Sequence, residues 1–202
     1  MSIESVVVRI QELEQAFSPR QPATAPTQQT TSATPGSFST MLQQAASAGG
    51  AAGVSPVGGT AGQRIVQIAE GEVGQAEQPP GSNDSPRIAQ YRSATAGSPG
   101  PGPWCAYFAS WVARQAGVPV GDQGQGFGAV DGLWSWAQSS GKAVPSGQPP
   151  RPGDLMIMNE HVGIVQSVLP NGQVQTIEGN YSDKVASNVR PVSDAIGFVR
   201  LG

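Results

Sequence analysis

The composition of the chain changes near residue 61, and this change restricts where a folded core can form. Residues 18–60 consist almost wholly of Ala, Thr, Ser, Gln, Pro and Gly, with few large apolar side chains. Such a stretch buries too little apolar surface to offset the entropy of ordering its backbone. We therefore predict a disordered linker over 18–60 and one folded domain over 61–202, which carries all 4 tryptophans of the 202-residue chain.

The first 17 residues are predicted to form a short amphipathic helix. Apolar residues recur there at spacings of three and four, which places them on one face: Ile3, Val6, Ile10, Leu13 and Phe17. Because so short a helix is marginal alone in water, the apolar face indicates a protein partner for residues 2–17, which is another protein or a second copy of the chain. The alternative is a frayed terminus that only looks amphipathic.

The pattern of residues 61–202 changes from helical to extended near residue 154. We expect helices at about 62–70, 85–92, 105–117 and 131–141, and strands at 155–158, 161–168, 173–178 and 196–201. The Asn171-Gly172 pair between the second and third strands is typical of a hairpin turn. Helices followed by an antiparallel sheet predict an α+β domain, with the N-terminal helices packed on the sheet.

The chain has 1 cysteine and 1 histidine, and each begins a predicted element. Cys105 begins a helix, where the helix dipole and free backbone N–H groups favour the nucleophilic thiolate. His161 begins a strand, and an imidazole beside a thiol acts as its base and later protonates a leaving amine. Each residue also has a structural interpretation, because a cysteine is commonly buried in a core and a histidine is commonly hydrogen-bonded within a fold.

A catalytic imidazole needs a hydrogen-bond acceptor on its second nitrogen, which holds its orientation. Glu178 is the candidate, because it and His161 lie at comparable distances from the Asn171-Gly172 turn on the two arms of the hairpin. Asn180 follows two residues later and is positioned to support the same site. The set Cys105, His161, Glu178 and Asn180 therefore forms a candidate catalytic site.

Two other carboxylates near His161 are poorer partners for it. Asp154 lies in a Pro-Gly-Asp turn, where side-chain hydrogen bonds to the backbone explain its presence. Glu160 is expected to point to the opposite face of the strand. Among the aromatic residues, Trp104, Trp134 and Tyr181 are candidates for substrate binding, although core packing is the alternative for the tryptophans.

Charge and composition exclude several classes of function. The chain has 11 basic and 14 acidic residues without a Lys/Arg cluster, which disfavours a nucleic-acid partner. No segment is long and apolar enough for a membrane span, and the N-terminus lacks the basic and apolar regions of a secretory signal. A substrate outside the cytoplasm therefore requires specialised secretion or lytic release.

The motifs around these residues resemble the CHAP domain, the cysteine, histidine-dependent amidohydrolase/peptidase family. They occur in the family's order over residues 62–202: Pro103-Trp104-Cys105-Ala106, Arg151-Pro152-Gly153-Asp154, His161-Val162-Gly163-Ile164-Val165 and Glu178-Gly179-Asn180. The resemblance implies a papain-like α+β fold and cleavage of amide bonds in peptidoglycan. It assigns Cys105 as nucleophile, His161 as base, Glu178 as orienting acid and Asn180 as a fourth polar position. The sequence is also similar to the NlpC-type wall peptidases, but Glu178-Gly179-Asn180 favours CHAP.

The resemblance sets the expected function. Some CHAP domains carry an acidic calcium loop before the cysteine, but only Asp84 lies there, so we predict no metal and no other cofactor. We expect an N-acetylmuramoyl-L-alanine amidase or an endopeptidase acting at the cell wall, in the periplasm or outside the cell. The alternatives are a catalytically silent wall-binding or assembly module and acyl transfer to an amine. Residues 1–17 and 38–46 are similar to leader segments of flagellum-associated wall hydrolases.

Overall fold

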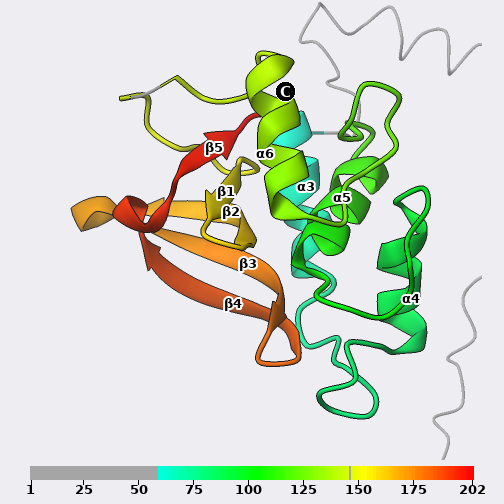
Figure 1. The fold of residues 1–202 in the computed structure, drawn as a ribbon. Coiled ribbons are helices and arrows are strands. Elements are labelled where there is room, and N and C mark those ends of the chain that lie inside the picture. The colour runs from blue at the N-terminus through cyan, green and yellow to red at the C-terminus, as the bar shows by residue number, and fades with distance from the viewer. Residues whose placement is uncertain (1–58, 146) are drawn as a thin grey trace, which may run out of the picture. The chain divides into compact units, whose positions relative to one another are not determined.

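An antiparallel sheet forms one layer of the fold, and the helices that precede it in the chain cover one of its faces (Figure 1). The computed structural model describes residues 59–145 and 147–202. The sheet has 5 strands in the order β4-β3-β2-β1-β5. The predicted α+β class is confirmed. The helix predicted over 1–17, the segment 38–46 and almost all of the predicted linker 18–60 lie outside the described residues.

The helices begin and end close to the predicted positions. They are α3 (Ala61–Glu70), α4 (Pro86–Ser93), α5 (Cys105–Gln115) and α6 (Val130–Ser139). Thr60 caps α3 through a reciprocal pair of hydrogen bonds with Gln63, of 2.8 and 3.3 Å. Ser85 caps α4, and Pro86 lies in its first turn. No helix among the described residues is long and apolar enough to cross a membrane.

The strands include one that the sequence pattern does not predict. They are β1 (Leu155–Met158), β2 (His161–Leu169), β3 (Gln173–Tyr181), β4 (Lys184–Pro191) and β5 (Gly197–Val199). Strands β2 and β3 form the predicted hairpin, and Asn171 and Gly172 turn it with φ angles of 68° and 74°. Strand β4 was missed because its residues are mostly polar and alternate in exposure, as in a strand at a sheet edge.

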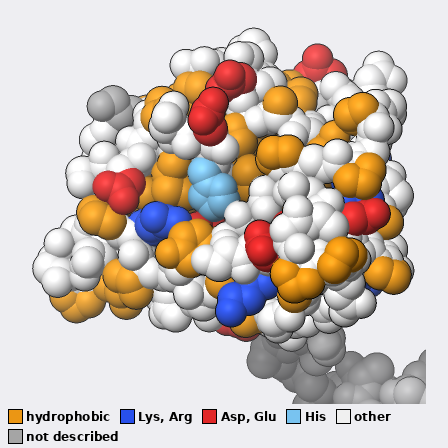
Figure 2. Space-filling view, turned by 60° about the horizontal axis from the view of Figure 1, so that its bottom comes forward, with side chains coloured by type: hydrophobic (Ala, Val, Ile, Leu, Met, Phe, Trp, Pro, Cys, Tyr) orange, Lys and Arg blue, Asp and Glu red, His pale blue; other side chains and the backbone are white. Residues whose placement is uncertain are grey.

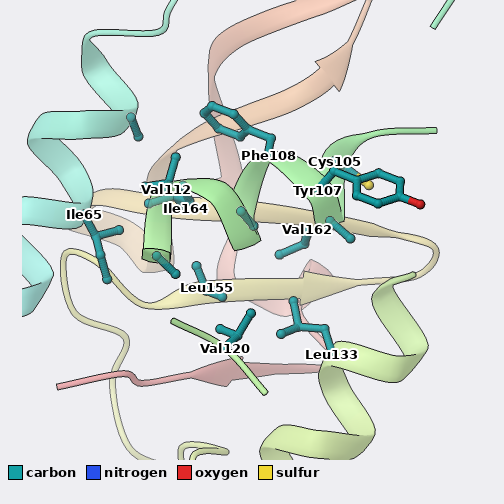
Figure 3. Packing of buried hydrophobic residues seen from close by; sticks show 14 of the residues in the cluster. Ile65, Cys105, Tyr107, Phe108, Val112, Val120, Leu133, Leu155, Val162 and Ile164 are labelled. Carbon is teal, nitrogen blue, oxygen red and sulfur yellow. The ribbon is translucent and has the colours of Figure 1, made fainter. Parts of the chain in front are cut away.

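The main core lies between the helices and one face of the sheet, with α5 at its centre (Figure 3). Phe108 and Val112 of α5 pack toward Ile164 of β2, and all three side chains are buried. A smaller cluster on the opposite face of the sheet contains Met156 and Phe198. Because α5 is held against β2 and β3, its first residue is placed beside the start of β2.

Candidate active site

The first turn of α5 places Cys105 at a helix start that no side chain caps. Trp104 is the N-cap residue, and its indole makes no capping hydrogen bond. The first backbone hydrogen bond of the helix runs from Phe108 N to Trp104 O, at 2.9 Å. The backbone N–H groups that precede Phe108 in this turn therefore have no intrahelical acceptor. Cys105 itself is a free cysteine, 5% exposed, whose side chain reaches a surface cavity.

His161 is the first residue of β2 and pairs across the sheet with Met158 of β1. Its ring lies in a hollow of the surface, between apolar and basic side chains (Figure 2). Nε2 of the ring lies 2.9 Å from Oε2 of Glu178. Because that nitrogen faces the carboxylate, Nδ1 is the ring nitrogen left for Cys105, which lies close enough to raise the pKa of the imidazole.

The surroundings of His161 favour its charged form. Burial lowers the pKa of His161, but hydrogen bonds with Cys105 and Glu178, and the charges of both groups, together raise it to about 9. An imidazole with this pKa holds its proton at neutral pH. The structure therefore favours a protonated His161 between Cys105 and the Glu178 carboxylate.

Glu178 is fully buried in β3, and every partner it has is a hydrogen-bond donor. Arg190 of β4 holds it with two bonds, from Nε to Oε1 at 2.8 Å and from Nη2 to Oε2 at 2.7 Å. Thr176 donates its hydroxyl to Oε1 at 2.6 Å. Burial raises the pKa of Glu178, but the bonds from Arg190, His161 and Thr176 lower it to about 2. Glu178 is therefore a permanent carboxylate at neutral pH, and it fixes the imidazole without taking its proton.

Glycines make room for this arrangement at two points. A Cβ atom added to Gly163 would lie 3.0 Å from Cγ of Glu178, so the side chain of Glu178 crosses the space that Gly163 leaves. A Cβ added to Gly179 would lie 2.7 Å from Cβ of Phe108 and 2.9 Å from the ring of Trp104. The strand after Glu178 is thus in direct contact with the start of α5, which brings the two halves of the site together.

Asn180 and Tyr181 lie beside His161, where the sequence placed them. Both line a cavity of about 360 Å³ that His161 and Arg190 also line. Tyr181 is 39% exposed, and Cζ of Arg190 lies 5.2 Å from the centre of its ring. The register of β3 and β4 shifts between Glu178 and Tyr181, and the backbone of Asn180 has a φ of 59°, which is not that of a regular strand. Asn180 and Tyr181 are therefore neighbours of the Cys105–His161 pair.

The structure places Trp104 in the core and not at the surface of the site. Its ring is fully buried, stacks on Tyr91 with ring centres 5.8 Å apart, and donates from Nε1 to Glu77 at 2.9 Å. A buried carboxylate takes the indole N–H, so the ring packs inward and leaves no face for a substrate. Trp104 supports the helix start from within the core.

Trp134 is also not brought to the Cys105–His161 pair. It is half-buried in α6 and packs on Gly197 of β5, where an added Cβ would lie 2.3 Å from its ring. The cavity that it lines contains Phe198 and Pro149 but none of the residues around Cys105 or His161. The tight packing on β5 therefore separates Trp134 from the site.

Of the poorer candidates for a partner of His161, Asp154 binds other groups and Glu160 lies in a turn. Asp154 accepts a hydrogen bond from the backbone N–H of Arg151 at 2.8 Å, as the turn predicted, and it also binds Arg200. Glu160 lies in the turn between β1 and β2, with φ of 53°, and not on the opposite face of a strand. Asp84 binds Arg92 and the backbone N–H of Ser85. Among the described residues, no group of three or more Cys, His, Asp or Glu is arranged to hold a metal ion.

A second cavity, of about 530 Å³, adjoins Cys105 on the side of the Pro/Gly loop. Five consecutive residues of this loop line it, from Pro99 to Pro103, together with the start of α6. Cys105 lines this cavity and His161 lines the one beside Tyr181, so each residue of the pair borders a different cavity. An extended substrate has room on both sides of the thiol.

Three residues of this region were missed at the level of sequence. Arg190 belongs to the unrecognised β4, Thr176 lies two residues before Glu178 on the same face of β3, and Tyr107 lines the cavity next to Cys105. Period-2 alternation could have identified Thr176 as a neighbour of Glu178. Nothing in the sequence near Arg190 indicates its partner.

Residues 97–180 match the family model described as the CHAP domain, so this part of the chain is similar to that family. This family is generally hydrolytic, with amidase or peptidase activity, and is typical of proteins that act on peptidoglycan in the cell wall. A comparison with curated proteins finds no match to the chain. The family match does not extend to the N-terminal segment, so the similarity of that segment to flagellum-associated wall hydrolases is not borne out.

Proposed function

We propose that the protein is a peptidoglycan hydrolase that cleaves an amide bond through an acyl-enzyme on Cys105, as an N-acetylmuramoyl-L-alanine amidase or an endopeptidase. The observation that carries the proposal is the position of His161 between Cys105, which raises its pKa, and Glu178, whose Oε2 lies 2.9 Å from its Nε2. A lone buried thiol would need no such partners. The CHAP domain supplies the substrate class, which is the peptide of the cell wall.

In the first half of the reaction, the Cys105 thiolate attacks the carbonyl carbon of the wall amide. The backbone N–H of Cys105, at the uncapped start of α5, is placed to donate to the oxygen that becomes negative. The C–N bond then breaks as the imidazolium of His161 gives its proton to the leaving amine. The acyl group remains on sulfur as a thioester.

In the second half, His161 takes a proton from water, which attacks the thioester carbon. The C–S bond breaks and releases a carboxylic acid, and the thiolate–imidazolium pair forms again. Glu178 keeps the imidazole in one orientation throughout, because its own proton affinity is too low for it to compete. Asn180 and Tyr181 contribute to the wall of the site on the His161 side.

Clearing of purified cell walls by the full chain tests the proposal, with Cys105→Ala as the inactive comparison. We expect the variant to lose at least about three orders of magnitude in rate. Ser110→Ala is a matched control, because it removes a similarly small buried group from α5 outside the site. Equal clearing by the wild type and Cys105→Ala would reject the cysteine mechanism.

Mass spectrometry of the released fragments identifies the bond and separates the alternatives. Hydrolysis produces one new amine and one new carboxyl end, whereas acyl transfer joins the acyl group to another amine. Binding to walls without new ends would instead support the silent wall-binding module. For hydrolysis, a free muramic-acid lactyl carboxyl indicates the amidase, and a cut within the peptide indicates the endopeptidase.

A further inference from the structure

The side chain of Tyr107 is almost wholly buried, and its hydroxyl lies at the cavity beside Cys105. Tyr107 is only 7% exposed, and it lines this cavity together with Gly128. A Cβ added to Gly128 would lie 2.4 Å from the Tyr107 oxygen, so the loop before α6 passes directly over the phenol. Figure 3 shows the ring extending away from the rest of the cluster, with its oxygen at the far end.

This hydroxyl has no hydrogen-bond partner among the described residues. Tyr91, the other tyrosine that is more than nine-tenths buried, donates to Glu72 at 2.6 Å. The Tyr107 oxygen is not among the enclosed side-chain atoms of the described residues that lack a partner, so water or a ligand can reach it from the cavity. Since the Tyr107 oxygen reaches a cavity beside the proposed nucleophile, a polar group of the substrate is a suitable partner.

The charged residues around the same cavity indicate which polar group of the substrate would bind there. Asp131 at the start of α6 and Glu160 in the β1–β2 turn both line it, and no basic side chain does. Neither carboxylate has an ion-pair or hydrogen-bond partner among residues 59–145 and 147–202. Four other carboxylates of the domain, by contrast, each bind an arginine: Glu72, Asp84, Asp154 and Glu178.

We propose that the cavity beside Cys105 binds an ammonium group of the substrate peptide, with the Tyr107 oxygen as acceptor and Asp131 and Glu160 as the opposing charges. This inference rests on the proposed function and names the substrate class of the same site. A wall peptide carries such a group on the side chain of a diamino acid or at a free N-terminus. The cavity on the His161 side is different, because Arg190 and Asp194 both line it and no single charge prevails.

Three versions of one wall peptide test the inference: unmodified, acetylated on the side-chain amine and acetylated on the N-terminal amine. Acetylation of the recognised amine should lower kcat/KM of the full-length protein about tenfold or more, since two exposed carboxylates contribute up to about fivefold each. The sensitive position tells the diamino-acid side chain from the N-terminus.

Variants assign the effect to the cavity. In Asp131→Asn/Glu160→Gln, the ratio of kcat/KM between free and acetylated peptide should fall to about one. Tyr107→Phe should raise KM for the free peptide severalfold, with kcat little changed and the packing under Gly128 kept. Glu70→Gln, a matched charge change at an exposed position of α3, should keep the wild-type ratio.

Binding to the Cys105→Ala protein separates this inference from the proposed function. Calorimetric titration with the three peptides should show weaker binding when the recognised amine is acetylated, even if no bond is cut. Equal affinities, or no binding of any version, would overturn the inference. Absence of hydrolysis by the wild type with discrimination in binding would instead reject only the enzymatic proposal.

Discussion

Two buried carboxylates, Glu178 and Asp154, are held by Arg190 and Arg200 in nearly the same geometry but have different third partners. Arg200 holds Asp154 with bonds of 2.9 and 2.6 Å, and Arg190 holds Glu178 with bonds of 2.8 and 2.7 Å. Asp154 also accepts a backbone N–H, whereas Glu178 faces the ring of His161. A bidentate pair alone therefore does not indicate a functional site, and the remaining contact of the carboxylate distinguishes the two.

Each pair acts on a different part of the fold. Asp154–Arg200 links the turn before β1 to the residue after β5, close to the point where Gly62 of α3 packs on Pro152. Glu178–Arg190 links β3 to β4 and orients the imidazole. We expect changes to the first pair to affect stability alone, and changes to the second to affect activity as well.

Replacement of the two carboxylates by amides should produce the largest difference. Glu178→Gln keeps the shape of the side chain but gives His161 a neutral partner, so kcat/KM should fall by about 10³–10⁴. Asp154→Asn should lower the midpoint of thermal unfolding by several degrees and leave kcat/KM of the folded protein unchanged. Rates on a wall peptide and thermal unfolding check both; an equal loss of kcat/KM in the two variants would abolish the distinction.

Replacement of the arginines by lysines should give the next largest effect. A lysine makes one point contact where arginine makes two parallel bonds, so Arg190→Lys should loosen Glu178 and lower kcat/KM about tenfold. Arg200→Lys should reduce stability to a similar degree without this loss of rate. If kcat/KM is equally insensitive to both substitutions, Arg190 has no part in positioning His161.

The dependence of kcat/KM on pH should reflect the ionisation of His161 and should not depend on the Asp154–Arg200 pair. Because the pKa of His161 is raised to about 9, the imidazolium persists at neutral pH, and kcat/KM should fall about tenfold per unit above about pH 9. Asp154→Asn should keep this alkaline limb. The measurement is kcat/KM from pH 5 to 11, and a limb near the ordinary histidine value of 6.5 would contradict the arrangement.

The raised pKa of His161 and the lowered pKa of Glu178 should also affect stability, at opposite ends of the pH range. The raised pKa of His161 contributes stability that is fully present below 6.5 and is lost as the pH rises through about 9. The lowered pKa of Glu178 contributes stability that is present above 4.5 and is lost as the pH falls through about 2. Unfolding by denaturant as a function of pH checks both directions, and Glu178→Gln should abolish the loss of stability that Glu178 causes at acid pH.

The smallest effect should come from Thr176, the third donor to Glu178. Thr176→Val removes its hydroxyl but keeps its shape, and should lower the free energy of unfolding by about 1–2 kcal/mol and kcat/KM severalfold. Thr95→Val is the matched control, because the Thr95 hydroxyl is buried without a hydrogen-bond partner and its removal should cost nothing. Equal losses in the two variants would show that the bond to Glu178 contributes little.

The comparison also explains how much could be predicted from sequence. The hairpin that brings Glu178 to His161 was predictable, because Asn171-Gly172 sets the turn and period-2 alternation sets the faces. The structural interpretation of Asp154 was predictable from its turn. The turn residues and the alternation of the strands are local signals, because they lie within a few residues of the features that they determine.

The arginines and Trp104 were not predictable, because their partners are remote in sequence. Arg190 lies in a polar edge strand with little apolar pattern, and Arg200 meets Asp154 only after β5 has joined the sheet. An aromatic residue next to a nucleophile suggests a substrate contact. The Trp104 indole instead donates a hydrogen bond to the buried Glu77 and packs in the core. Tertiary hydrogen bonds therefore decided what residue type and spacing could not.

The order in which the site is assembled has a consequence for the newly made chain. Cys105 leaves the ribosome before His161, and both precede Glu178 and Arg190. Strand β3 must also close against Trp104 and Phe108 over Gly179 before the carboxylate reaches its place. The nascent chain therefore presents only an isolated thiol, and the reactive arrangement forms when synthesis of the domain is almost complete.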